Sequence, residues 1–118
     1  MAFVPFHSID SSTDGTEIEL IAAGENVSSV KSVLLTNTDD GDLNVSLYIQ
    51  DSQTGDKYYM LYLVLLPQAS SLLLDSDDML AFNNSSTGYS LNLGTGTTSD
   101  KVDVLIKKLV LWSTLEKL

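Results

Sequence analysis

The chain has 118 residues and no cysteine, so it is long enough for one domain with its own core and has neither a disulfide framework nor a thiolate zinc site. Sixteen acidic residues face six lysines and no arginine, and the net charge of −10 argues against binding to the phosphate backbone of nucleic acid. Hydrophobic residues make up 43% of the chain, which is too apolar for a disordered acidic segment.

Residues 1–15 form a predicted N-terminal arm. They combine the apolar Phe3, Val4 and Phe6 with the loop sequence SIDSSTDG, and they have neither the basic start nor the long apolar stretch of a secretory signal. The single histidine, His7, lies in this arm, and the sequence contains no G-x-S-x-G elbow that would complete a catalytic triad with it. We therefore predict a surface histidine and a protein that is not an enzyme.

Short apolar runs follow the arm at regular intervals, and they are separated by Gly, Asn, Asp, Ser and Thr rather than by helix caps. This rhythm is typical of short strands joined by turns. We expect strands at residues 17–23, 30–36, 43–50, 58–66, 71–74, 79–82, 89–93 and 102–112.

The run at residues 43–50 is the clearest of these strands, because apolar and polar residues alternate along it and so face opposite sides. Tyr48 falls on the polar side, where we expect it to be exposed and to contact a partner. The Asp40-Gly41 step before this run favours a hairpin that pairs residues 30–36 with 43–50. The loop at residues 51–56 favours a second hairpin with 58–66, so the three strands would form a meander.

The run at residues 58–66 is apolar or aromatic on both sides and stops at Pro67. It is shorter than the about 20 residues that a membrane-spanning helix needs. Since neither side is polar, we expect an inner strand that is covered on both faces. A Leu63→Asp change would then place a carboxylate in the core and unfold the domain.

These elements predict an all-β protein, an antiparallel two-sheet β-sandwich with a jelly-roll topology, or alternatively an immunoglobulin-like sandwich. The sandwich domain is expected at residues 16–112, with a C-terminal tail at 113–118. The end of the chain carries the apolar Leu109, Leu111 and Trp112. It and the N-terminal arm are expected either to pair with each other at an edge of the core or to dock on a neighbouring subunit.

Two groups of aspartates raise the question of calcium, and they are Asp39, Asp40 and Asp42 around Gly41, and Asp75, Asp77 and Asp78. The spacing of an EF-hand is missing, and aspartate is common in turns for its backbone hydrogen bonding. We predict no metal and no cofactor.

Glutamates and tyrosines are the other candidates for a site. Glu17 and Glu19 lie two residues apart on one strand face, and a solvated edge is the better interpretation than a glycosidase pair. The tyrosines suit either a sugar-stacking platform or a protein interface, of which we favour the interface. They are Tyr48, Tyr58, Tyr59, Tyr62 and Tyr89.

Three stretches resemble small virion accessory proteins of tailed bacteriophages, especially marine and cyanobacterial phages. They are VSSVKSVLLTNTDDGDLNVSLYIQDSQTG, YYMLYLVLLPQASSLLLDSDDMLAF and GYSLNLGTGTTSDKVDVLIKK, within residues 27–108. The resemblance rests on a pattern of strands and does not include the arm or the last ten residues.

The resemblance implies a non-enzymatic capsid decoration or cement protein, made in the host cytoplasm and carried on the virion. Its expected partners are the major capsid protein or other virion proteins, with no direct nucleic acid and no membrane, and a homotrimer is the implied oligomer. The alternative is a neck, tail or fibre component that binds a receptor or glycan. The residues expected at the partner contact are Phe3, Val4, Phe6, Tyr48, Leu109, Leu111 and Trp112.

Overall fold

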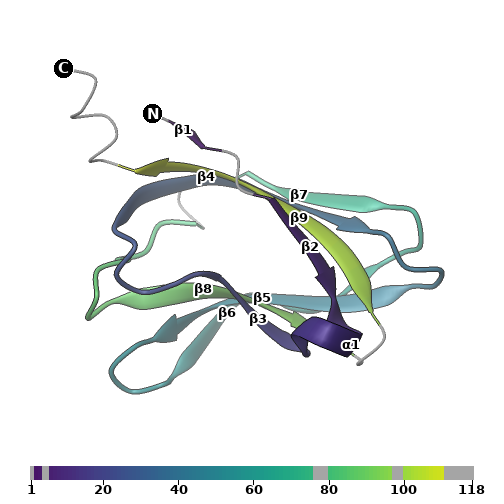
Figure 1. The fold of residues 1–118 in the computed structure, drawn as a ribbon, viewed down its shortest axis with the longest axis horizontal. Coiled ribbons are helices and arrows are strands. Elements are labelled where there is room, and N and C mark those ends of the chain that lie inside the picture. The colour runs from purple at the N-terminus through teal and green to yellow at the C-terminus, as the bar shows by residue number, and fades with distance from the viewer. Residues whose placement is uncertain (1, 4–5, 76–79, 97–99, 111–118) are drawn as a thin grey trace.

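The structure, a computed structural model, describes residues 2–3, 6–75, 80–96 and 100–110, which form two antiparallel sheets packed face to face (Figure 1). One sheet has five strands: β1 (Ala2–Phe3) and β2 (Phe6–Asp10) both pair with β9 (Lys101–Val110), which is followed by β4 (Val27–Asn37) and β7 (Ser71–Leu74). The other sheet has four, in the order β3 (Glu17–Ile21), β8 (Tyr89–Thr95), β5 (Leu43–Asp51) and β6 (Lys57–Leu66).

The strand order is that of a jelly roll. The path β2-β9-β4-β7 faces the path β3-β8-β5-β6, and most successive strands alternate between the two layers. The predicted all-β jelly-roll sandwich is therefore confirmed, and the immunoglobulin-like alternative is not the one observed. Leu80 to Phe82, in the expected strand at 79–82, do not form a strand, and Met79 lies outside the described residues.

The core lies between the two sheets and consists of branched aliphatic side chains from both. Alternate residues of β5, β8 and β9 point inward, so burial of their apolar side chains drives the two layers together. Its fully buried members include Ile21, Val33, Leu35, Val45, Leu47, Leu91, Leu93, Val102, Val104 and Ile106.

The first predicted hairpin is wrong. β4 and β5 lie in opposite sheets, and the loop at 38–42 crosses between them instead of turning back within one sheet. Asn37 braces this crossing, since its side-chain amide donates to the carbonyls of Gly41 (2.8 Å) and Leu66 (3.0 Å). Gly41 does not have a positive φ, so the glycine conformation on which the hairpin prediction was based does not occur here. The second hairpin, β5 with β6, is confirmed.

The prediction for residues 58–66 is also wrong, because β6 is the edge strand of the four-stranded sheet and is not covered on both faces. Tyr62 and Leu65 are 64% and 58% exposed, and Tyr58, Tyr59 and Leu63 are exposed as well. A run without polar residues thus marks an apolar outer surface here. Pro67 ends a strand at an open edge of the sheet, a position at which proline is tolerated.

The N-terminal segment belongs to the sandwich more closely than an arm at 1–15 implies. β2 pairs with β9 along its whole length and Ile9 is buried in the core, while β1 pairs Phe3 with Lys108. Of the two alternatives for the ends of the chain, the described backbone shows edge pairing. The short helix α1 (Ser11–Asp14) follows β2, and no helix in the described ranges is long and apolar enough to cross a membrane.

Candidate binding site

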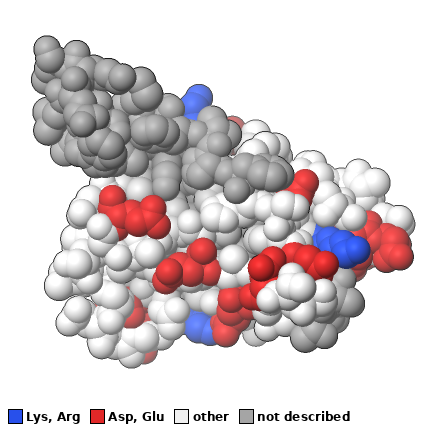
Figure 2. All heavy atoms as spheres, in the orientation of Figure 1, with Lys and Arg blue, Asp and Glu red and all other residues white. Residues whose placement is uncertain are grey.

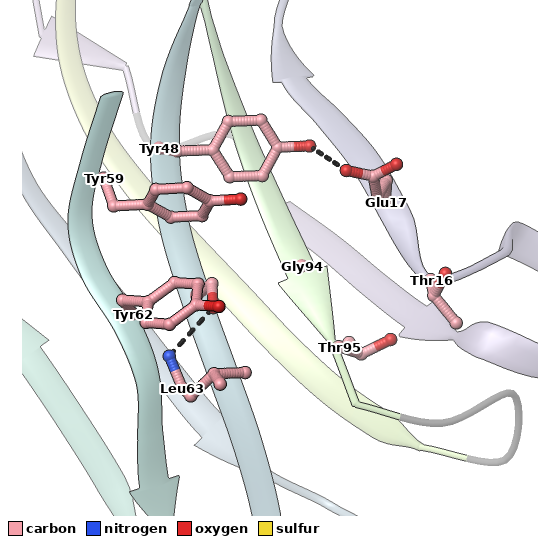
Figure 3. Close-up of a pocket in the computed structure, with 9 residues that line it drawn as sticks. Thr16, Glu17, Tyr48, Tyr59, Tyr62, Leu63, Gly94 and Thr95 are labelled. Carbon is pink, nitrogen blue, oxygen red and sulfur yellow. Dashed lines mark hydrogen bonds between the residues drawn. The ribbon is translucent and has the colours of Figure 1, made fainter. Parts of the chain in front are cut away.

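A hollow of about 160 Å³ opens on the outer face of the four-stranded sheet, on the side away from the core (Figure 3). All four strands of the sheet or their immediate flanks contribute to it, so residues far apart in the sequence meet there. Its lining consists of Thr16, Glu17, Ser46, Tyr48, Tyr59, Tyr62, Leu63, Gly94 and Thr95.

Gly94 of β8 forms part of the floor of the hollow. A Cβ at this position would stand 3.5 Å from the Cβ of Ser46 and 3.9 Å from Cε1 of Tyr48, which are ordinary contact distances. The glycine is therefore not required by a clash or by a positive φ. Its missing side chain leaves the space that the surrounding side chains enclose.

Three tyrosines form one wall. The ring centroids of Tyr48 and Tyr59 are 5.2 Å apart, and those of Tyr59 and Tyr62 are 4.8 Å apart with the planes at 73°. Such tilted and edge-to-face pairs are favourable because of the ring quadrupole. In Figure 3 the rings extend from β5 and β6 in the direction of Glu17 and Thr16. The Tyr62 ring is the most exposed of the three, so an aromatic surface is open to solvent.

A bulge in β6 brings Tyr62 and Leu63 to the same face. In a regular strand successive side chains point to opposite faces, yet both of these residues are exposed. The pairing of β5 with β6 shifts register on both sides of Leu47, and Leu63 has a φ of 52°. The Leu63 amide donates to the Ser46 hydroxyl at 2.9 Å, which holds the bulge in place (Figure 3).

A polar contact closes the opposite side of the hollow. Tyr48 Oη donates to Glu17 Oε1 at 2.9 Å, and the Lys57 ammonium forms an ion pair with the same oxygen. Lys57 Nζ also lies 5.1 Å from the centroid of the Tyr48 ring, within reach of a cation–π interaction. The site therefore contains one carboxylate whose charge is balanced locally.

These contacts shift the protonation equilibria of the three groups. The hydrogen bonds from Lys57 and then from Tyr48 lower the pKa of Glu17. Burial, followed by the hydrogen bond to Glu17, raises the pKa of the Tyr48 hydroxyl, and the bond to Glu17 raises the pKa of Lys57. At neutral pH the arrangement is thus a neutral phenol, a carboxylate and an ammonium. Apart from the Glu17–Lys57 ion pair, acidic side chains are spread over the face seen in Figure 2 with few lysines among them.

Tyr48 is the predicted contact residue that the structure places at this site, but its predicted exposure is wrong. It does lie on the outer face of β5, yet it is only 3% exposed because it packs against Tyr59 and bonds to Glu17. Glu17 and Glu19 are exposed on the edge strand β3, as expected of a solvated edge.

The structure does not describe the side chains of the other predicted contact residues. Phe3, Phe6 and Leu109 are described only in their backbone, which pairs within the five-stranded sheet. Val4, Leu111 and Trp112 lie outside the described residues, as does the predicted tail at 113–118.

The other polar residues considered as candidates are the loop aspartates and His7. Asp42 accepts a hydrogen bond from the Gln68 amide at 2.9 Å, and Asp39 donates its own amide to Asn37 Oδ1 at 2.8 Å. Within residues 2–3, 6–75, 80–96 and 100–110, no three His, Asp or Glu side chains gather as a possible metal site. Asp77 and Asp78 lie outside these ranges. His7 lies in β2 opposite Val104.

Sequence reasoning missed the roles of Gly94, Ser46 and Lys57 in this hollow. Lys57 and Glu17 are 40 residues apart, and no local pattern links them. The pairing of Ser46 with Leu63 depends on a bulge that alternation does not reveal. The tyrosines gave a usable signal, since three of the five that suggested a sugar platform do line the site, as does Glu17.

Comparison with known proteins does not assign the chain to a family. No protein-family model matches it, and no curated protein sequence matches it. Among solved structures, the chain is similar to the CBM22-1–GH10 modules of the Clostridium thermocellum endo-1,4-β-D-xylanase 10B complexed with xylohexaose, at 15% identity and a TM-score of 0.36. The match covers 91% of this chain and 25% of that one, so the chain spans about a quarter of the length of that structure.

Proposed function

We propose that the chain is a non-enzymatic structural protein of a virus particle, which binds the head of a tailed phage as a decoration or cement protein and stabilises the shell. The resemblance of residues 27–108 to phage virion accessory proteins supports this proposal. A rigid jelly roll with a small core and one open apolar edge is a suitable frame for adhesion.

The observation that carries the proposal is the edge strand β6. Its sequence is KYYMLYLVLL, in which Lys57 is the single charged residue, and its large side chains include five exposed ones. Edge strands of free proteins are ordinarily protected by charges, prolines or covering segments, since an open edge pairs with other chains. An unprotected apolar edge is therefore a surface suited to a partner, and a partner strand added alongside β6 would satisfy its free backbone groups.

Binding of this kind stabilises a shell by linkage. A protein that binds the assembled shell and not the free capsid subunits shifts the equilibrium toward the shell. Several copies attached at fixed spacing raise the effective concentration for each further contact, so modest affinity per contact suffices. We propose the major capsid protein or another virion protein as the partner, and a homotrimer as the bound form.

Copy number in purified virions tests the proposal. Quantitative mass spectrometry of particles from the phage that encodes the chain is expected to give many copies per particle in a fixed ratio to the major capsid protein. Particles that lack the protein should lose resistance to heat. Absence from purified particles, or a handful of copies at a neck or tail, would contradict the decoration role.

Co-sedimentation with shells tests the edge itself. A Leu65→Lys change adds a charge to exposed β6 and is expected to weaken shell binding about tenfold. Gln53→Lys places the same charge on the exposed loop between β5 and β6 and should bind as the unaltered protein does. Equal binding by both variants would show that the edge of β6 is not the contact.

A further inference from the structure

We infer that the hollow on the outer face of the four-stranded sheet is a binding site for a single uncharged sugar ring of the pyranose type. The inference does not rest on the proposed shell binding, although Tyr59, Tyr62 and Leu63 belong both to the exposed side chains of β6 and to the lining of the hollow (Figure 3).

The size of the hollow sets the first limit on the ligand. Its volume of about 160 Å³ is below the roughly 300 Å³ at which pockets for drug-sized ligands begin. One ring fits such a space, and a longer ligand must extend from it across the open sheet surface. A terminal or internal unit of a glycan satisfies both conditions.

The walls combine the two kinds of surface that a sugar ring presents. Tyr59 and Tyr62 stand at 73° to each other and form an aromatic corner, whose electron-rich ring faces attract the polarised C–H groups of a pyranose. On the opposite side, both side-chain contacts that Glu17 makes with described residues use Oε1. Oε2 therefore remains an acceptor for a sugar hydroxyl, and Thr16 next to Glu17 also lines the hollow.

The local charges favour an uncharged ligand. The Lys57 ammonium already pairs with Glu17 and lies over the Tyr48 ring, which are the two positions that a cationic ligand would seek. An acidic sugar would be repelled by Glu17 and by a chain whose net charge is −10. A polyhydroxylated neutral ring avoids both conflicts.

The site is formed before any ligand binds. Leu63 holds a left-handed φ of 52°, a conformation that is costly for leucine and persists where surrounding contacts enforce it. The Ser46 hydroxyl enforces it here by accepting the Leu63 amide. Because the bulge fixes Tyr62 beside Tyr59, little side-chain freedom remains to be lost on binding.

A glycan array gives the direct test. The full-length protein is applied to immobilised neutral hexose and pentose oligosaccharides, to sialylated and uronate-containing ones, and choline is titrated separately in solution. We expect retention on neutral glycans and none on the acidic ones or with choline. No retention on any neutral glycan, or binding of choline in their place, would overturn the inference.

Variants then locate the binding. Tyr62→Ala removes an exposed ring and should lower affinity for the best neutral glycan about tenfold in titration calorimetry. Gly94→Ala adds a methyl group to the floor at distances its neighbours tolerate, and should lower affinity several-fold with an unchanged melting curve. Tyr58→Ala is the matched control, since Tyr58 is an exposed tyrosine of the same strand outside the hollow. Equal affinity of the Tyr62 and Tyr58 variants would place the site elsewhere.

The two proposals fail separately. Leu65→Lys should weaken shell binding and retain glycan binding, because Leu65 does not line the hollow. Gly94→Ala, on β8 and not on β6, should weaken glycan binding and retain shell binding.

Discussion

Tyr48 on β5 donates a hydrogen bond to Glu17 on β3, with 2.9 Å between Tyr48 Oη and Glu17 Oε1, and so ties the interior of the four-stranded sheet to its far edge across β8. The bond is partly buried, and the ring of Tyr59 packs against the ring of Tyr48. It gives β3 a side-chain anchor in addition to its pairing with β8.

Removing the Tyr48 hydroxyl should weaken this anchor. We expect Tyr48→Phe to lower the free energy of unfolding by about 1 kcal/mol, the typical net contribution of one hydrogen bond, without changing the fold. Chemical denaturation with an unchanged m-value would measure the loss. Tyr58→Phe is the control, because no described residue bonds to the Tyr58 hydroxyl, and an equal loss there would contradict the role given to Tyr48.

The ion pair of Lys57 with Glu17 predicts a pH dependence. The pKa of Glu17 is lowered in the folded chain, so its contribution to stability is complete above the unfolded value of 4.5 and is lost as the pH falls through the folded value. Glu17 is 57% exposed, so solvent screening keeps the effect small. Carboxyl NMR titration of a Lys57→Met variant should show the Glu17 pKa moving up. An unchanged Glu17 pKa would mean that Lys57 does not hold the carboxylate in solution.

Leu63 provides a test of the edge position of β6. Since Leu63 is 55% exposed, Leu63→Asp should fold and change stability by about 0.5 kcal/mol or less, contrary to the unfolding expected of an inner strand. Aspartate also tolerates the left-handed φ at this position better than most residues. Leu47→Asp, at a fully buried site, should abolish cooperative melting. Loss of folding in the Leu63 variant would show that β6 is covered.

Gly88 should be far less replaceable than Gly41. A Cβ on Gly88 would lie 2.2 Å from the backbone oxygen of Asn83, so Gly88→Ala must displace the turn before β8 and should cost about 1 to 3 kcal/mol. At Gly41 nothing lies within 4 Å of the added Cβ and φ is not positive, so Gly41→Ala should be close to neutral. Thermal melting of the two variants distinguishes them, and similar melting temperatures would contradict the close packing at Gly88.

Most strand positions after the N-terminal segment were predictable because they depend on local patterns. Alternation in residues 43–50 and the turn residues on either side locate β5 within one residue of its observed end. Strand partners depend on the path of the chain between sheets, which neighbouring residues do not encode. The Asp40-Gly41 step is compatible with a hairpin and with a crossing, and the hydrogen bond from the Asn37 side chain to Leu66 at the end of β6 stabilises the crossing.

The candidate site was predictable in part for the same reason. Alternation assigned Tyr48 to the outer face of its strand correctly, but that face is covered there by Tyr59 from the neighbouring strand. The apolar run at 58–66 gave the right strand and the wrong burial, since hydrophobicity does not distinguish an inner strand from an adhesive edge.

The position of β9 has a consequence for how the chain reaches its native state. β9 lies between β4 and the two N-terminal strands, so β2 has no neighbour in its sheet until residues 101–110 have left the ribosome. Completion of this layer therefore waits for the last strand of the sandwich, and folding that depends on such distant partners is slow. Until β9 pairs with it, this edge of β4 is unpaired and can associate with other nascent chains.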